Sequence, residues 1–137
     1  MSVYNKFQAF VEHTAEKVHN LGSDQLVVAL TNTAPVATNT VLADITEISY
    51  TNLSSRNITI TSSEQTTGTY KLVLADLVLT ASGAVGPFRY VVVYNDTPTS
   101  PADPLICWYD HGSSISLASG DTFTIDWDSA QGVLTIS

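Results

Sequence analysis

Three histidines are the side chains best suited to acid–base or metal chemistry near neutral pH. His13 and His19 lie six residues apart in a segment predicted to be helical, which places them on different helix faces and argues against a shared metal ion. His111 follows Asp110 at a predicted turn, but no nucleophile is placed by the sequence to use that pair. We therefore predict no catalytic histidine and no metal-binding histidine pair.

Two carboxylates near the end of the chain could also act together. Asp126 and Asp128 are two positions apart in a predicted strand, so both side chains point to the same outer face. Paired carboxylates can serve glycoside hydrolysis or bind calcium, but a calcium loop needs more oxygen ligands, and only Asp96 and Asp103 in one loop approach that spacing. We interpret these groups as solvated acidic surface and predict no metal and no cofactor.

The other candidate groups fit packing better than chemistry. The sequence has no phosphate-binding glycine loop, no HExxH or GxSxG motif and no paired Cys–His spacing, so we predict that the chain is not an enzyme. Cys107 is the only cysteine and lies in the apolar run LICWY, which indicates a small buried side chain. Several aromatic residues could line a sugar-binding face, but strand alternation directs most of them toward a core: Tyr90, Tyr94, Trp108, Tyr109 and Trp127.

Composition excludes several classes of partner. The chain has 137 residues, enough for one domain with its own core, and carries 13 acidic against 5 basic residues, a net charge of −8. Nucleic-acid binding needs a basic footprint, which is missing, and an anionic membrane surface is disfavoured for the same reason. No apolar stretch approaches the roughly 20 residues of a membrane helix, and no secretory signal is recognisable, so we expect synthesis in a cytoplasm.

The N-terminal segment is predicted to form one amphipathic helix over residues 3–19. Val3, Phe7, Phe10 and Val11 begin an apolar stripe with three- and four-residue spacing. Ser2 is a plausible N-cap, and the sequence Asn-Leu-Gly at residues 20–22 supplies a stop. We expect this helix to close one side of a sheet, although docking on a partner subunit is an alternative.

A strand over residues 25–30 is followed by a long polar stretch. Residues 31–50 contain one proline and short apolar islands, with one or two helical turns expected around Leu42. A segment of this length is unusual as a simple loop in a compact domain. We therefore predict an extended arm or loop that contacts a partner.

Residues 57–137 are expected to supply the main strands. Residues 56–62 alternate apolar and polar side chains, and the polar run SSEQTTG is predicted to turn the chain. In the next strand Leu74 and Leu77 have opposite phase, which predicts a bulge or bend near Ala75-Asp76 where the strand crosses between two sheets.

The second half of the chain contains a predicted central strand. Residues 88–94 are apolar on both faces, with Phe88, Tyr90, Val92 and Tyr94 expected to point one way. A proline-rich loop follows at residues 95–104, then a strand, a turn at HGSS and further short strands. The last segment, GVLTIS, is expected to form a hairpin with the strand before it.

These patterns predict a mainly β protein. Short strands separated by turn signals are typical of a β-sandwich or a jelly-roll-like barrel, here with one N-terminal amphipathic helix. We expect residues 1–137 to form a single domain.

Three segments of the sequence are similar to a known class of proteins. The stretches LTNTAPVATNTVLADITEI, SGAVGPFRYVVVYNDTPTSPADPLICWYDHGSSISLASGDTFTIDWD and GVLTIS resemble small structural proteins of tailed bacteriophages. The resemblance covers nearly the whole chain and implies a β-rich virion component such as a head decoration, or cement, protein. It supplies no motif whose functional residues can be carried over.

The resemblance implies a structural virion protein that binds and stabilises an assembled capsid. Its partners would be the major capsid protein or other virion subunits, with self-association into a homo-oligomer. An alternative is a tail or baseplate component with a carbohydrate- or receptor-binding β-sandwich. A small hydrolase using Asp126, Asp128 or His111 ranks last.

The partner contacts are predicted to lie in the helix, the 31–50 segment and the 95–104 loop. The residues expected to make them are apolar or proline: Phe7, Val11, Pro35, Val36, Leu42, Pro98 and Pro101.

Overall fold

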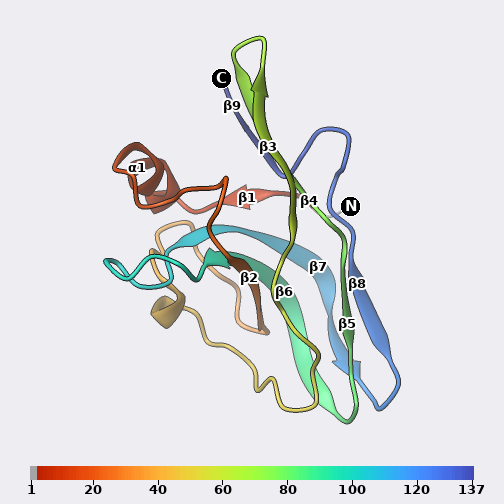
Figure 1. Ribbon diagram of the computed structural model, residues 1–137. Helices are drawn as coiled ribbons and strands as arrows, with labels where there is room; N and C mark the ends of the chain where they lie inside the picture. The colour runs from red at the N-terminus through yellow and green to blue at the C-terminus, as the bar shows by residue number, and fades with distance from the viewer. Residues whose placement is uncertain (1–2) are drawn as a thin grey trace.

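The computed structural model describes residues 3–137, so the predicted cap at Ser2 lies outside the described residues. The protein is mainly β, with several antiparallel sheets (Figure 1). The elements are β1 (Asn5–Lys6), α1 (Ala9–Ala15), β2 (Leu26–Thr31), the 3-10 turn η1 (Leu42–Asp44), β3 (Ile60–Thr66), β4 (Thr69–Leu74), β5 (Leu77–Thr80), β6 (Val85–Asn95), β7 (Leu105–Leu117), β8 (Thr122–Ile125) and β9 (Leu134–Ile136).

The central sheet has the strand order β1-β7-β6-β2, and every pairing is antiparallel. Strand β6 is buried on both faces, which confirms the prediction of a central strand. Val91 and Val93 belong to a large core cluster on one face, while Val92 and Tyr94 belong to a smaller cluster on the other. A strand covered on both sides needs apolar residues at consecutive positions, as this one has.

The predicted phase of β6 is wrong at one residue. Phe88 lies in the large cluster with Val91 and Val93, not on the face of Val92, because a register shift separates the pair Phe88–Ile115 from the pair Tyr90–Asp110. An extra unpaired residue changes which face the following side chains occupy. Alternation alone therefore predicts the correct face for the side chains of β6 only on the C-terminal side of the bulge.

Two smaller sheets cover the large core cluster. One has the order β3-β4-β9 and the other pairs β5 with β8, so β4 and β5 belong to different sheets. The break between them lies at Ala75-Asp76, where the amide of Ala75 donates to the carbonyl of Thr59 and the amide of Trp127 donates to Asp76. This confirms the predicted bend. The predicted terminal hairpin is wrong, because β9 pairs with β4 while β8 pairs with β5.

Two polar runs that were predicted to be turns are strand residues instead. Most of SSEQTTG lies in β3, and only Thr67 and Gly68 turn the chain, with φ angles of 53° and 83°. The HGSS run lies inside the thirteen-residue strand β7, where the shift between Tyr90–Asp110 and Phe88–Ile115 accommodates extra residues. Polar strands of this kind occur where only one face, or neither, is buried.

The N-terminal helix is shorter than predicted. α1 spans Ala9–Ala15, whereas Asn5 and Lys6 form β1 and pair with Trp108 and Cys107 of β7. This long-range pairing supplies backbone partners that a helix would otherwise have to provide. At the other end, Lys17 has a φ angle of 67°, a left-handed conformation that ends the helix. The predicted helix over residues 3–19 is therefore too long at both ends.

The segment over residues 31–50 is a loop lying against the body. Leu42 and Ile45 pack against the smaller core cluster, on the face of the central sheet opposite the two small sheets. Backbone hydrogen bonds tie it to the next loop, because the amide of Leu42 donates to Asp103 and the amide of Leu105 donates to Thr40. The predicted helical turn is present as η1, but the segment is not an arm held away from the domain.

Candidate interaction groove

Two of the carboxylates that could have done chemistry are engaged in local structure. Asp128 accepts hydrogen bonds from the amides of Ala130 and Gln131, which fixes a turn. Asp110 accepts two hydrogen bonds from the Arg89 guanidinium, which lowers the pKa of the Asp110 carboxyl. Asp126 is exposed. Residues 3–137 contain no group of three or more His, Cys, Asp or Glu placed to hold a metal ion.

Asp96 and Asp103 are brought near each other by the 95–104 loop. Burial raises the pKa of the Asp103 carboxyl, and the charge of Asp96 raises it further. Such repulsion between two carboxylates is what a bound cation would relieve. Two carboxylates without further ligands do not make a calcium site, so the pair remains an acidic surface feature.

The structure brings His13 and His19 together, contrary to the prediction from helical spacing. The helix ends before His19, the chain reverses at Lys17, and the amide of Val18 donates back to the carbonyl of His13. As a result the two imidazole centroids are 6.0 Å apart, and the ring of His19 also lies 5.2 Å from that of Phe10. The left-handed conformation of Lys17 ends the helix early. Lysine is not a residue type that marks this conformation, so the sequence carried no clear signal for it.

A buried hydrogen-bond network holds His19 in place. Asn95 is fully buried at the end of β6, and its amide nitrogen lies 3.0 Å from Nδ1 of His19 and 2.7 Å from Oδ2 of Asp24. The Asn95 oxygen accepts from the amide of Thr97, which fixes the orientation of the side-chain amide. Because Asn95 donates to Nδ1, neutral His19 carries its proton on Nε2.

His19 is also held in its neutral form. Burial lowers its pKa to about 4, with a further contribution from the nearby His13, while the charge of Asp24 opposes the shift. A neutral imidazole protonated on Nε2 is a hydrogen-bond donor without a positive charge. His19 therefore offers a donor and no cation at neutral pH.

Three polar atoms near this network have no hydrogen-bond partner among the described residues. They are Nδ1 of His13, Oγ1 of Thr14 and Nε2 of His19, and all three are buried. An unpaired buried polar group costs on the order of 1–3 kcal/mol. Three such atoms within seven residues mark a place where the fold leaves hydrogen-bonding capacity unused.

These residues border a groove between α1 and β9. The polar half of the groove, of about 580 Å³, is lined by Thr14, Lys17, His19 and Asp24 together with residues of the 95–104 loop, β3, β4 and β9. The apolar half, of about 690 Å³, is lined by β1, α1 and β9. Thr14 and Ile136 line both halves, so we treat them as one surface and call it the α1–β9 groove.

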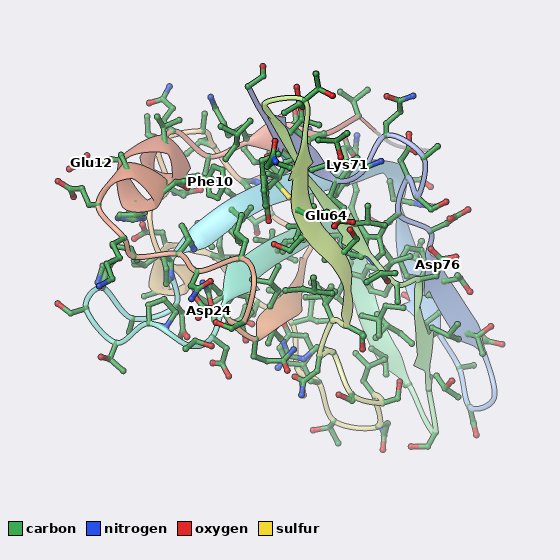
Figure 2. All side chains as sticks on the ribbon, turned by 45° about the horizontal axis from the view of Figure 1, so that its top comes forward. Phe10, Glu12, Asp24, Glu64, Lys71 and Asp76 are labelled. Carbon is green, nitrogen blue, oxygen red and sulfur yellow. The ribbon has the colours of Figure 1, made fainter. Side chains whose placement is uncertain are left out.

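The walls of the apolar half carry exposed aliphatic side chains. Val11 on α1 is 54% exposed, and Ile136 on β9 is 44% exposed. Figure 2 shows Phe10 on the side of α1 that faces the sheets and Glu12 on the opposite side. The groove therefore lies on the apolar flank of the helix, away from its acidic face.

Charge is distributed unevenly around the groove. Three of the five basic side chains are engaged elsewhere: Arg56 with the carbonyl of Val28, Arg89 with Asp110, and Lys71 with the carbonyl of Ala130. The other two, Lys6 and Lys17, line the groove and form no hydrogen bond or ion pair with residues 3–137. The charged side chains that line the groove are Lys6, Lys17 and Asp24, so the lining carries a net side-chain charge of +1 in a chain of net charge −8.

The structure separates the residues that were predicted to contact a partner. Phe7 is fully buried against Trp108, and Pro35 is also buried, so neither is exposed to a partner in the folded chain. Val11 and Pro98 line opposite halves of the α1–β9 groove. The remaining three lie elsewhere: Val36 is 54% exposed, whereas Leu42 and Pro101 are half-buried.

The aromatic residues and the cysteine mainly build the core, as predicted. Trp127, Tyr109, Tyr94 and Cys107 are buried, and burial raises the pKa of the Cys107 thiol. A small depression of about 180 Å³ remains beside them, lined by the rings of Phe123, Tyr109 and Trp127 together with His111 and Asp126. In this depression aromatic rings lie beside the polar side chains of His111 and Asp126.

No helix within residues 3–137 is long and apolar enough to cross a membrane. Comparison of the chain with known proteins finds no matching family model, no matching curated protein and no matching solved structure.

Proposed function

We propose that this chain is a structural virion protein of a tailed bacteriophage, specifically a capsid decoration protein that binds and stabilises the assembled shell. The resemblance of its main segments to phage structural proteins motivates the class. We further assign the central sheet and the two smaller sheets to a β-sandwich. In this proposal the protein acts by binding, without catalysis, and is made in the host cytoplasm before joining the particle.

The α1–β9 groove is the observation that most supports a binding role. It combines exposed aliphatic side chains with unpaired polar atoms on a scaffold whose central strand β6 is buried on both faces. Contiguous apolar surface bordered by polar groups is typical of protein interaction sites. A decoration protein needs such a surface on a stiff domain, because it must hold neighbouring subunits in fixed positions.

The overall charge fits an outer position on the particle. A net charge of −8 disfavours contact with packaged DNA and limits non-specific association before assembly. The major capsid protein or another virion subunit would then be the partner, and self-association at a symmetry axis would create several identical contacts.

The direct test is to look for the chain in purified particles by mass spectrometry and to rebind it to shells that lack it. The proposal predicts a fixed copy number per particle and a higher shell disassembly temperature after rebinding. Ile136→Asp should abolish rebinding, whereas Val78→Asp, which changes a similarly exposed aliphatic residue (50%) on β5, should not. Absence of the chain from purified particles would contradict the proposal.

A second candidate function is carbohydrate or receptor binding in a tail or baseplate. The depression lined by Phe123, Tyr109 and Trp127 with Asp126 is the observation that favours it, since sugar rings stack on aromatic faces and donate hydroxyls to carboxylates. Glycan-array binding that is lost in Phe123→Ala and kept in Ile136→Asp would support this alternative. An array without any bound glycan would count against it.

A further inference from the structure

The two halves of the α1–β9 groove offer different chemistry to one occupant. The apolar half is bounded by Phe10 and Val11 on α1 and by Leu134 and Ile136 on β9. The polar half contains His19 and Thr14, whose buried Nε2 and Oγ1 atoms have no partner among the described residues, and the ammonium group of Lys17. An occupant that fits both halves must be apolar at one end and hydrogen-bonding at the other.

The polar half is built to receive an acceptor. His19 must carry its proton on Nε2, because Asn95 donates to Nδ1, so the atom that lacks a partner is a donor. Thr14 adds a hydroxyl and Lys17 adds a positive charge. Hydrogen-bond donors placed beside a positive charge are typical of sites that bind a carboxylate.

The one carboxylate in the lining of the polar half does not fill this role. Oδ2 of Asp24 already accepts from the amide of Asn20 at 2.8 Å and from Asn95 at 2.7 Å. The network around Asp24 therefore positions His19, whose Nε2 atom remains without a partner among the described residues. A bound cation fits poorly, because residues 3–137 hold no group of three metal-ligating side chains.

The second wall of the groove is the edge of a sheet. Among the described strands β9 pairs with β4 alone, so its other edge is unpaired, and residues 133–137 line the apolar half of the groove. Lys6 extends the positive charge to the apolar half, where it is the only charged side chain among the described lining residues. An extended peptide can lie along such an edge, with alternate side chains entering the two halves.

We propose that the α1–β9 groove binds an extended segment of a partner protein that carries an Asp or Glu side chain. The carboxylate enters the polar half beside His19, Thr14 and Lys17, and aliphatic side chains of the same segment occupy the apolar half beside Val11 and Ile136. This inference rests on the proposed function, because it names the kind of segment that a virion partner would present.

Charge complementarity favours an acidic partner over a second copy bound through the same surface. Two copies bound through this surface by a two-fold axis would bring two grooves together that each carry Lys6 and Lys17. Like charges held close together oppose association, whereas an acidic segment is attracted to both lysines. The occupant is therefore a carboxylate-bearing segment of a different chain.

The test uses two capped pentapeptides with the isolated protein. One has an aspartate between aliphatic residues, and the other has an asparagine at that position. Heteronuclear NMR titration follows the backbone amides of Thr14, Thr135 and Ile136 and the imidazole nitrogens of His19. The aspartate peptide should shift these signals, and the asparagine peptide should bind about tenfold more weakly, as expected for loss of one charged hydrogen bond.

Paired variants separate the carboxylate site from general electrostatics. Lys17→Gln should weaken binding of the aspartate peptide about tenfold, whereas Lys71→Gln, an equal charge change outside the groove, should leave it unchanged within about twofold. Thr14→Val removes the hydroxyl without changing side-chain shape and should weaken the aspartate peptide more than the asparagine peptide.

Each outcome of the titration decides the inference. Equal affinity for the two peptides would overturn the carboxylate site, and no shift in the groove with either peptide would overturn the inference as a whole. NMR shifts at the groove that appear without peptide and grow with protein concentration would show that a second copy of the chain binds there. That result would also overturn the inference. If the aspartate peptide binds but the chain is absent from particles, the proposed virion role fails while this inference stands. If the chain is present in particles but the aspartate peptide does not bind, only this inference fails.

Discussion

Strand β6 and the α1–β9 groove belong to one scaffold but differ in how completely their groups are satisfied. Along β6, five consecutive residues, 91–95, are buried, with core clusters on both faces and hydrogen-bonded strands on both edges. In the groove, aliphatic side chains are exposed, and the buried Oγ1 of Thr14 and Nε2 of His19 have no partner among the described residues. The first region supplies stability, and the second is the surface that we propose for recognition.

The two regions meet at Asn95. It is the last residue of β6, and its side chain reaches His19 and Asp24 at the polar half of the groove. A rigid central strand therefore sets the position of the groove histidine. Four predictions follow from this division, and they are ordered from the largest change in stability to the smallest.

Phe88→Ala should have the largest effect. Phe88 is fully buried in the large core cluster, and its ring lies 5.2 Å from that of Phe123. Removing a buried aromatic ring leaves a cavity and costs about 3–5 kcal/mol in the free energy of unfolding. Urea denaturation measures this, with Val11→Ala on the groove wall as the control. A loss below about 1 kcal/mol for Phe88→Ala would show that the core is not packed as described.

Asn95→Ala should have an intermediate effect at the junction of the two regions. The substitution leaves Nδ1 of His19 and the amide of Thr97 without their partner, at a cost of about 1–3 kcal/mol. The control is Asn57→Ala, because Asn57 is exposed and its side chain forms no hydrogen bond with the described residues. Equal stability of the two variants, measured by thermal unfolding, would argue against the buried network.

Stability should also depend on pH through His19. Burial lowers its pKa in the folded protein to about 4, below the ordinary histidine value of 6.5, so between these pH values the unfolded chain binds more protons. Its contribution is therefore complete above pH 6.5 and is lost as the pH falls toward 4, with a slope of at most about 1.4 kcal/mol per pH unit.

The pH experiment has a matched control in the exposed His111. Urea midpoints measured across this pH range should lose part of their slope in His19→Gln and keep it in His111→Gln. All the carboxylates are present in both variants, so the comparison reports the part of the slope that depends on His19 and its direct neighbours. Identical slopes in the two variants would mean that His19 is not buried in its neutral form.

Ile136→Ser should have the smallest effect on stability and a large effect on binding. The side chain is 44% exposed at the end of β9, so its truncation should change the free energy of unfolding by about 0.5 kcal/mol or less. The same change should weaken binding of the capped aspartate peptide, measured by NMR titration. Unchanged peptide affinity would show that Ile136 is not part of the interaction surface.

The sequence predicted the parts of the fold that depend on local apolar pattern. The double apolar face of residues 91–94 identified a central strand, and the phase change beside Ala75 identified the break between β4 and β5. Both signals come from apolar side chains that must be buried whichever strands pair with them. Burial of Cys107 followed from the apolar run LICWY, and burial of Trp127 followed from strand alternation.

The parts that failed depend on contacts between distant residues. Asn5 and Lys6 continue the helical pattern but pair with β7, about a hundred positions away, and β9 pairs with β4 instead of its neighbour β8. The groove could not be predicted at all, because it requires the reversal at Lys17 that brings His19 beside His13. A helical wheel separates those two histidines, and no local pattern indicates where the helix stops.

A cryo-EM map of purified particles tests the central claim most directly. The account predicts density for this β-rich domain on the capsid, with an extended segment of a neighbouring subunit lying between α1 and β9 and an acidic side chain beside His19 and Lys17. A map in which the domain is absent, or in which the α1–β9 groove faces solvent while another surface contacts the shell, would contradict it.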